Sequence, residues 1–479
     1  MNLQFFNTLN HKIESFNPLQ TNSNTVGFYC CGPTVYDFAH IGNFRTFVFA
    51  DLVRRFLEFK GYMVNHVMNI TDVDDKIIKR VNSSTHKISR KDYTDQYEKA
   101  FFDDFLQLNC LKPKHIPHAS EYIPQMCTLI QKLMDNGIAY QTSDGSIFFS
   151  IKRYIELGGK YGQLAKINFD ESRIGERIKN DEYEKENVAD FALWKARIPS
   201  DGDVYWNSPW GQGRPGWHLE CSAMSRDLLG DTFDIHVGGE DLVFPHHEDE
   251  IAQSEGSTLS AENHTPTPFV KYWLHFSHLL SEGKKMSKSL GNFYTLRELF
   301  AEGYTGREIR YLLLSAHYRE SLNFTKEGLN AARTALTRLD ECLMKLAELA
   351  GNTTGTAENS SLVQDFDNAL SNDLNLSAAW AVVFEWVREI NKLIADNKLT
   401  PPKAADALAS YEKINAVLGI DHKKQVSDDI PEEIKNLLEA RQTARKAKDF
   451  SKADAIRDEL KSKGWVIEDT PKGARLKKL

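Results

Sequence analysis

Apolar residues near the N-terminus change from a strand pattern to a helix pattern and back. Residues 26–31 (VGFYCC) form a short apolar run rich in β-forming side chains, which predicts a buried strand. Apolar residues then recur at helical spacing over 49–57, and a second strand pattern follows at 62–70. Strand, helix and strand in this order predict a βαβ unit, and therefore the start of a doubly wound parallel sheet.

The middle of the chain mixes both patterns. Residues from about 84 to 140 are mostly helical in pattern, and 145–151 (GSIFFSI) predicts a strand. The charged stretch 170–190 is typical of an exposed insertion. Further strands are expected at 233–237 and within 270–280.

Beyond residue 325 the pattern becomes helical throughout. It keeps the 3.6-residue period to about 418, with a Gly/Thr/Asn/Ser loop at 351–360 and a linker at 420–430 before a last helical piece. The predicted fold is α/β, with a doubly wound, Rossmann-like parallel-sheet domain that carries an insertion. An α-helical bundle and a small C-terminal domain follow it.

Length and composition narrow the class of protein. The 479 residues exceed one ordinary core, so about three domains are expected. No run of 18 apolar residues exists and the N-terminus lacks a signal-peptide pattern, so no membrane association is expected. Six cysteines, two of them adjacent, do not form a disulfide framework, and a reducing cytoplasm is the expected location.

The charge is unevenly distributed. A net charge of -8 argues against a surface that binds nucleic acid everywhere. Residues 431–479, however, hold 13 Lys and Arg against 9 Asp and Glu. This local excess points to a polyanionic partner, although a solvated helical surface is the more common reason for such a composition.

One window, 216–250, gathers metal-ligating side chains. His246 and Glu250 are four residues apart and would share a helix face, and Cys221 precedes them. Thiolate, imidazole and carboxylate form a zinc-type ligand set, but three ligands are too few for a closed structural site. A capped, solvated helix beside a buried cysteine explains this window equally well.

Two short motifs are typical of nucleotide chemistry. His40-Ile-Gly42-Asn43 follows the first strand, where doubly wound sheets bind ligands, but alone it is no more than a common surface turn. Residues 285–289 (KMSKS) place two lysines in a glycine-flanked loop, where they can neutralise a polyphosphate.

Together, the two motifs are the joint signature of class I aminoacyl-tRNA synthetases, and the chain resembles the cysteinyl-tRNA synthetases among them. The resemblance covers nearly the whole chain. The segments that carry it are 31–37 (CGPTVYD), 69–76 (NITDVDDK), 208–224 (SPWGQGRPGWHLECSAM), 244–250 (FPHHEDE), 317–319 (HYR), 323–325 (NFT), 464–465 (GW) and 468–469 (ED).

The resemblance implies a fourth metal ligand. In this family the cysteine of the CGPTVYD string joins the later Cys, His and Glu on zinc, so Cys31, Cys221, His246 and Glu250 are the expected ligands of one Zn²⁺. Cys30 should point to the other side of its strand and pack in the core. A zinc-bound thiol loses its proton, whereas the serine hydroxyl is harder and less acidic, so the metal would select L-cysteine.

The resemblance also assigns the substrate pockets. It implies cysteine-binding roles for Thr71, Trp217, His236 and Asp241. For Thr71 and Trp217 taken without the family, ordinary core packing is the more common role, and Asp241 fits a helix cap equally well. The residues expected to bind ATP, accompanied by Mg²⁺, are Thr34, His40, Gly42, Asn43, Gly239, Lys285, Ser287 and Lys288. Of these, His40, Asn43, Lys285 and Lys288 are the expected catalytic residues.

Asn43 departs from the family, which usually has a second histidine there. An asparagine side chain still donates a hydrogen bond but carries no charge at any pH.

The implied activity is ATP-dependent charging of tRNA(Cys) with cysteine by a cytoplasmic monomer, in which Trp465 either stacks on a base or packs in the tail core. Two alternatives are a paralogue that joins cysteine to an amino-sugar and a non-catalytic, zinc-containing RNA-binding paralogue. The expected division of the chain is 1–112 and 201–270 for the two catalytic halves, 113–200 for the insertion, 271–328 for the KMSKS and stem-contact region, 329–425 for the helical bundle and 430–479 for the anticodon-recognition domain.

Overall fold

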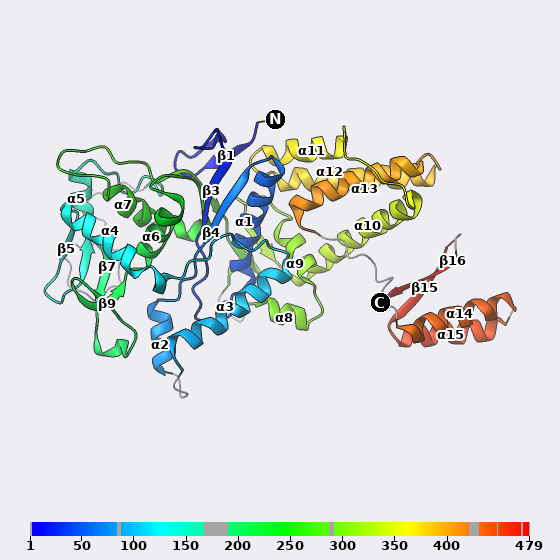
Figure 1. Cartoon of the computed structure of the whole chain (residues 1–479). Helices are drawn as coiled ribbons and strands as arrows, with labels where there is room; N and C mark the ends of the chain where they lie inside the picture. Colours follow the sequence, from blue (N-terminus) through cyan, green and yellow to red (C-terminus); the bar gives the residue numbers. More distant parts are fainter. Residues whose placement is uncertain are drawn as a thin grey trace. The chain divides into compact units, whose positions relative to one another are not determined.

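The computed structural model describes residues 2–83, 88–166, 190–286, 292–420, 431–447, 449–470 and 473–478. It divides into two compact units, Met1–Ile420 and Asp421–Leu479 (Figure 1). Apart from their end residues Asp190 and Ile420, the predicted insertion at 170–190 and linker at 420–430 lie outside the described residues. The described helices include none that is long and apolar enough to cross a membrane.

A four-stranded parallel sheet forms the centre of the first unit. Its strands are β3 (Thr25–Cys30), β4 (Met63–Met68), β10 (Phe233–Gly239) and β11 (Val270–Phe276), in the order β11-β10-β3-β4. Helix α1 (Ile41–Phe59) connects β3 to β4, which confirms the predicted βαβ unit. One strand was expected within 270–280, but two strands begin there. The first is β11, and the second, β12 (Leu279–Ser281), belongs to a different sheet.

The two faces of this sheet bury different side chains. Val26, Phe28 and Cys30 of β3 pack in the hydrophobic cluster that contains α1. Tyr29 and Cys31 belong to a separate cluster on the other face. Successive residues of a strand point to opposite faces, so the two adjacent cysteines are separated by the sheet. The predicted core position of Cys30 is confirmed.

A second, antiparallel sheet was not predicted. Of its strands only Ile147–Phe149 was predicted, within the range 145–151. Three of the five strands have only three residues, and such runs are too short to show a period. The sheet order is β5-β6-β7-β9-β8, formed by β5 (Ala139–Gln141), β6 (Ile147–Phe149), β7 (Phe191–Ala196), β9 (Gly211–Pro215) and β8 (Trp206–Ser208).

The helical pattern after residue 325 is confirmed. Four helices follow one another, α10 (Lys326–Ala350), α11 (Ser361–Ser371), α12 (Leu376–Ala395) and α13 (Pro401–Leu418), with the expected loop between the first two. The remaining elements of the first unit are β1 (Gln4–Asn7), β2 (Lys12–Ser15), α2 (Asp75–Ser83), α3 (Arg90–Gln107), α4 (Ile123–Asp135), α5 (Ile151–Glu156), α6 (Trp217–Leu229), α7 (Glu248–Gly256), β13 (Lys284–Lys285), α8 (Leu296–Ala301), α9 (Gly306–Leu313) and β14 (Leu322–Phe324).

The second unit contains a helical pair and a hairpin. Helices α14 (Glu432–Lys446) and α15 (Phe450–Ser462) precede the antiparallel strands β15 (Trp465–Thr470) and β16 (Gly473–Lys478). Trp465 is only 6% exposed and packs with Ile456 and Leu460 in the small core of this unit. A ring buried to this extent offers little surface to a base, which favours the packing role for Trp465.

A buried ion pair joins α1 to the end of the bundle. Arg310 of α9 is fully buried and donates to Asp51 of α1 at 2.6 Å. The same guanidinium donates to the carbonyl oxygens of Leu418 at 2.7 Å and Leu108 at 3.0 Å. Asp51 also accepts from Arg55 at 2.7 Å. Burial alone would raise the pKa of the Asp51 carboxyl, but these two arginines outweigh it and hold that pKa below its usual range.

Candidate active site

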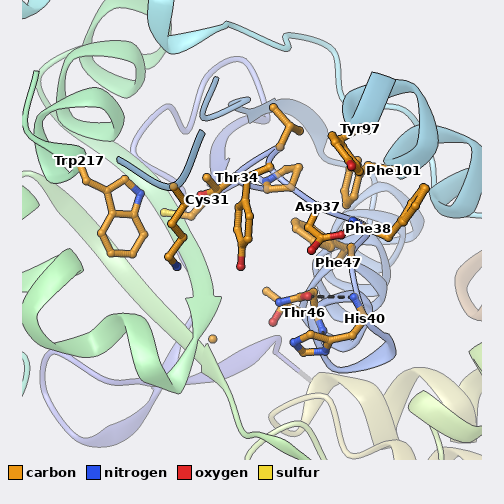
Figure 2. Close-up of a pocket in the computed structure, with 18 of the residues that line it drawn as sticks. Cys31, Thr34, Asp37, Phe38, His40, Thr46, Phe47, Tyr97, Phe101 and Trp217 are labelled. Carbon is orange, nitrogen blue, oxygen red and sulfur yellow. Dashed lines mark hydrogen bonds between the residues drawn. The ribbon is translucent and has the colours of Figure 1, made fainter. Parts of the chain in front are cut away.

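A cavity of about 670 Å³ opens at the carboxyl ends of β3 and β10 (Figure 2). Doubly wound sheets bind their ligands at this edge. Several residues singled out from the sequence line it, namely Cys31, Thr34, His40, Asn43, Trp217, Gly239 and Asp241.

The turn before α1 is built around two polar side chains. The His40 ring accepts a hydrogen bond from the backbone N–H of Asn43 at 3.3 Å. The side-chain oxygen of Asn43 accepts one from the backbone N–H of His40 at 3.1 Å. This reciprocal cap fixes the N-terminus of α1, where a helix attracts anions. A Cβ atom at Gly42 would lie 2.8 Å from the His40 ring, so glycine is required for that ring position.

The lysine-rich loop is anchored beside this turn. On one flank, the sulfur of Met286 would lie 3.7 Å from a Cβ atom at Gly42. On the other, the Phe293 ring packs 5.0 Å from the His40 ring, and Thr295 pairs with His40 as a backbone bridge. Lys285 ends β13, whereas Ser287 and Lys288 lie outside the described residues. Both ends of the loop therefore lie next to the predicted ATP turn.

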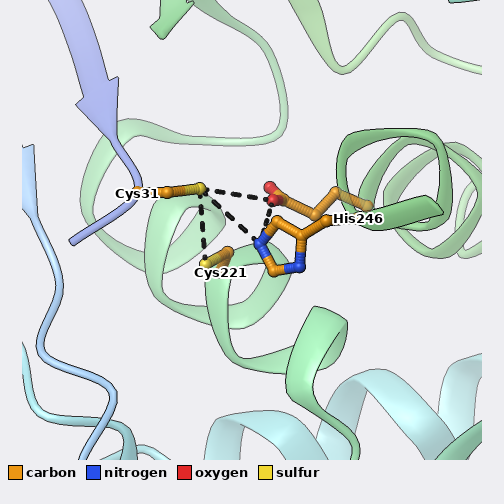
Figure 3. A group of neighbouring side chains, drawn as sticks. Cys31, Cys221 and His246 are labelled. Carbon is orange, nitrogen blue, oxygen red and sulfur yellow. Dashed lines mark hydrogen bonds and ion pairs between the residues drawn. The ribbon is translucent and has the colours of Figure 1, made fainter. Parts of the chain in front are cut away.

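The four predicted metal ligands converge (Figure 3). From the Cys31 sulfur, the Cys221 sulfur is 3.8 Å away, and His246 Nε2 and Glu250 Oε1 are both 3.6 Å away. His246 Nε2 and Glu250 Oε1 are 3.0 Å apart, across one helical turn as the spacing predicted. Cys31 comes from the end of β3, Cys221 from α6, and the other two from α7 and the turn before it.

These positions fit a four-coordinate metal ion. A tetrahedron with metal–sulfur bonds of about 2.3 Å has a sulfur–sulfur edge of about 3.8 Å. Contact with the Cys31 sulfur is the main reason that the pKa of the Cys221 thiol falls, to about 6. Burial alone would raise the pKa of Glu250, but His236 and His246 lower it to about 2. Cys221 and Glu250 thus favour the deprotonated forms that metal ligands need.

Neighbouring side chains orient the ligands. His236 Nε2 lies 2.9 Å from Glu250 Oε2, which leaves Oε1 directed at Cys31 and His246. His218 Nδ1 lies 2.7 Å from His246 Nδ1 and so directs the other ring nitrogen of His246 toward the cluster. His218 was missed in the sequence analysis, although it lies within the segment WHLEC beside Trp217.

A second group of possible ligands overlaps the first. Cys31, His236, His247 and Glu250 also have ligand atoms close together, with His247 Nε2 3.4 Å from the Cys31 sulfur. The set with Cys221 and His246 offers two thiolates. In that set His236 retains its hydrogen bond to Glu250, and His247 retains its bond of 2.8 Å to His275. We therefore favour the predicted set.

A buried carboxylate anchors the helix that supplies Glu250. Glu248 accepts hydrogen bonds from four consecutive backbone amides, those of residues 162–165, at 2.6 to 3.2 Å. Desolvation raises the pKa of its carboxyl, while these amides oppose the rise. The segment 162–165 thus holds the start of α7 in place.

The residues assigned to the amino-acid pocket occupy different depths. Trp217 is 40% exposed, and its ring lies 4.3 Å from the His246 ring at the cavity wall. Asp241 is exposed and lies close to Gly239. A Cβ atom built on Gly239 would lie 2.4 Å from the Asp241 carboxylate. Thr71 and His236 are buried, and neither is among the described residues that line the cavity. Direct contact of these two with a substrate stays a prediction.

Comparison with known proteins identifies the family. A family model described as "tRNA synthetases class I (C) catalytic domain" matches residues 16–334. The cysteine–tRNA ligase of Chlamydia felis is 47% identical over 484 residues, covering 100% of this chain and 98% of the relative. That of Chlamydia pneumoniae is 48% identical over 483 residues, with the same coverage of both chains. The chain belongs to the cysteine–tRNA ligase family.

Two further segments of the chain match family models as well. Residues 365–422 match the DALR domain, and 427–475 match the cysteinyl-tRNA ligase anticodon binding domain. The fold also resembles a methionyl-tRNA synthetase of Mycobacterium tuberculosis bound by methionyl-adenylate. That structure has a TM-score of 0.56 and 13% identity, covering 82% of this chain and 90% of the other. The family membership predicted from the motifs and the α/β fold predicted from the hydrophobic pattern are confirmed.

Proposed function

We propose that this chain is a cysteine–tRNA ligase that activates L-cysteine with ATP and transfers it to tRNA(Cys). One observation carries the proposal. Cys31 is a member of the metal-ligand cluster. It also lines the same cavity as His40 and Gly239. A thiol held at the cluster would therefore lie in the same cavity as the predicted ATP site.

In the first step the cysteine carboxylate attacks the α-phosphate of ATP, which releases pyrophosphate and leaves cysteinyl-adenylate. This chemistry depends on positioning and charge neutralisation rather than on a side-chain nucleophile. The side-chain oxygen of Asn43 is engaged in the cap of α1. The side-chain nitrogen of Asn43 is therefore the group that can donate to a phosphate oxygen. Lys285 and Lys288 are assigned to the β- and γ-phosphates, with Mg²⁺ accompanying ATP. Asp241 is assigned to the substrate ammonium.

Zinc is the proposed ion in the cluster, because two thiolates, an imidazole and a carboxylate suit it. When bound, it would hold the substrate sulfur as a thiolate and so favour cysteine over serine. Trp217 would cover the substrate side chain, and His236 and His218 would keep the ligands oriented. In the second step the 2′-hydroxyl of the terminal ribose of tRNA attacks the acyl carbon of the adenylate and loses its proton. The bond from the acyl carbon to the phosphate oxygen breaks, which releases AMP and leaves cysteinyl-tRNA.

The helical bundle at 329–425 and the tail at 430–479 are assigned to the anticodon arm, supported by the match of the tail to an anticodon binding domain. That match also disfavours the amino-sugar paralogue, which would not need such a domain. The cytoplasmic location is part of the proposal, because the thiolate ligands must stay reduced. The monomeric state and the domain limits stay predictions.

The direct test is ATP–pyrophosphate exchange with cysteine and with serine, followed by transfer of labelled cysteine to tRNA. We expect exchange with cysteine to exceed exchange with serine by a factor on the order of 10⁴, because a site built for one group rejects analogues that lack it. Comparable exchange with serine would contradict metal selection of the thiol. Transfer to an amino-sugar rather than to tRNA would identify the paralogue instead.

Asn43→Asp should separate the capping role from the donor role of this side chain. Aspartate retains the oxygen that caps α1, and its charge suits a helix N-terminus, so thermal stability should be unchanged or higher. The donor to phosphate is lost, however, and pyrophosphate exchange should fall about 100-fold. Asn43→His is the control and should keep most of the activity. Equal activity of the aspartate variant would exclude a donor role.

Trp217→Ala should weaken cysteine binding without unfolding the protein. The ring is 40% exposed, so its removal leaves no large core cavity. Loss of its contact with the substrate side chain should raise the KM for cysteine about tenfold, with the KM for ATP unchanged. Steady-state pyrophosphate exchange measures both constants, and Trp217→Phe should recover part of the affinity. A rise in both KM values would instead indicate a general distortion of the cavity.

A further inference from the structure

One buried side chain, the amide of Asn69, lies between the two metal-binding cysteines. Asn69 directly follows β4, whose end pairs with the end of β3, and it is only 1% exposed. Cys31 directly follows β3 and Cys221 belongs to α6, so the two sulfurs come from different elements (Figure 3). Contacts between these elements must therefore set the 3.8 Å that separates the sulfurs.

Hydrogen bonds fix the direction of the Asn69 amide. Its Oδ1 atom accepts from the backbone N–H of Gly32 at 2.9 Å and from the Tyr29 hydroxyl at 3.1 Å. A backbone N–H can only donate, so the amide atom that faces Gly32 must be the oxygen. The nitrogen Nδ2 is therefore directed the other way, and it donates to Thr71 Oγ1 at 3.1 Å.

The same amide oxygen borders the second sulfur. The Cys221 sulfur is 3.8 Å from Asn69 Oδ1. Gly32 directly follows Cys31, so one oxygen atom holds the residue next to the first sulfur and lies beside the second. An oxygen in this position donates no hydrogen bond to Cys221, and the lone pairs of its thiolate stay available to a metal ion. The amide is thus placed to set the distance between the two sulfurs.

The nitrogen of the amide connects the metal-ligand cluster to the predicted amino-acid pocket. The backbone N–H of Thr71 donates to the Pro33 carbonyl oxygen at 3.1 Å, and the N–H of Val35 donates to the Thr71 carbonyl oxygen at 3.2 Å. Pro33 and Val35 line the cavity, so the segment after β4 is bonded to the cavity wall. The Asn69 side chain joins the same two segments, through Gly32 on one side and Thr71 on the other.

We propose that Asn69 is a positioning residue for cysteine recognition, a clamp that holds the Cys31 and Cys221 sulfurs at metal-binding distance and anchors Thr71. The inference rests on the proposed function, in which a metal ion at these sulfurs binds the substrate thiol. A hydrogen-bonding group behind the ligands orients them and so changes the metal affinity. His40 and Asn43 are held by their own reciprocal cap, so ATP binding should not depend on Asn69.

Asn69→Leu tests the clamp, because leucine has nearly the shape of asparagine but no hydrogen-bonding atoms. The Kd of the full-length protein for Zn²⁺, measured by titration with a competing chelator, should rise about 10–100-fold. After exchange of the metal for Co²⁺, the sulfur-to-cobalt charge-transfer band should weaken. In pyrophosphate exchange, the KM for cysteine should rise about tenfold while the KM for ATP stays unchanged.

Two further variants separate hydrogen bonding from packing. Asn69→Asp keeps the oxygen acceptor, and the Thr71 hydroxyl can turn to donate to the second oxygen, so most of the metal affinity should return. Asn65→Leu removes an asparagine of β4 four residues earlier, which bonds to the His115 ring at 3.1 Å. This control should change neither the metal affinity nor either KM.

Three results would overturn the proposal. The first is a Kd of Asn69→Leu for zinc within twofold of the wild type, and the second is an equal loss of affinity in Asn69→Asp. The third is a rise in the KM for ATP together with that for cysteine, which would indicate general distortion. If Asn69→Leu does not fold, Tyr29→Phe decides. It removes one of the two donors to Oδ1 and should raise the Kd for zinc about threefold, and an unchanged Kd would overturn the clamp.

The outcome stays separable from the proposed function. If the wild-type protein bound zinc but formed no cysteinyl-adenylate, the proposed function would fail. The zinc affinity of the same variants would still decide the inference, because that measurement needs no catalysis. A wild-type protein that charges tRNA but holds no divalent metal would overturn the inference alone.

Discussion

Cys221→Ala is expected to abolish metal binding and to lower cysteine-dependent pyrophosphate exchange at least about 1,000-fold. The cluster would lose one of its two thiolates, and three remaining donors hold a borderline-soft ion far less well. Loss of the ion removes several kcal/mol of interaction with the substrate thiolate, which corresponds to a factor of this order. Metal content by atomic absorption and exchange kinetics, measured on one preparation, test both parts.

Cys30→Ala is the matched control. Cys30 is also a buried cysteine, adjacent to Cys31, but it packs against the α1 face of the sheet and belongs to neither ligand group. The control should retain its metal and its exchange activity, with a modest loss of stability. Full activity of metal-free Cys221→Ala would refute the thiol-binding role, and loss of metal from Cys30→Ala would refute the assignment of ligands.

Arg310→Ala should lower the free energy of unfolding by about 3–5 kcal/mol. The variant leaves the buried Asp51 carboxylate with Arg55 and the backbone amide of Leu111, and it strips donors from the carbonyl oxygens of Leu418 and Leu108. Urea unfolding of the full chain measures the loss. Arg388→Ala is the control. Its ion pair with Glu385 is exposed, so the expected change is below about 0.5 kcal/mol.

The same variant predicts a pH dependence. In the wild type the folded pKa of Asp51 is lower than the unfolded value of about 4, so the ion pair stabilises the fold fully at neutral pH. That contribution is lost as the pH falls through the folded pKa. The stability difference between wild type and Arg310→Ala should therefore shrink below about pH 4. A difference that stays constant into acid would show that packing, not charge, sets the effect.

Much of the site was predictable because its chemistry is concentrated in short segments. His246 and Glu250 are four residues apart, and Cys221 lies in the same window, so spacing alone marked three ligands. Cys31 could not be found in that way. It lies 190 residues before Cys221, at a sulfur–sulfur distance of 3.8 Å, and only the family resemblance connected the two.

What escaped prediction depends on contacts rather than on composition. His218 acts on His246 through a ring-to-ring contact, and the amides of residues 162–165 act on Glu248 through backbone geometry. Neither of these two contacts produces a periodicity or a residue spacing that can be recognised in the sequence. The five-stranded antiparallel sheet was missed for a related reason, because three of its strands have only three residues and β6 pairs with the distant β7, Ile147 with Trp194. The burial of Trp465 likewise follows from packing with Ile456 and Leu460.

The separation of Cys30 and Cys31 by the sheet has a consequence for how the gene can change. A deletion or insertion of one codon inside β3 would exchange the two sulfurs between the faces of the sheet, with the chemical inventory unchanged. After a deletion, Cys30 would face the metal cluster too early in the strand. After an insertion, Cys30 would take the place of Cys31, and Cys31 would be forced into the place of Gly32, where a Cβ atom would lie 1.6 Å from the Asn69 carbonyl oxygen. Loops that precede β3, such as residues 17–24, can vary in length without this penalty. Among natural variants, length changes should therefore accumulate before Thr25 and be absent between Thr25 and Cys31.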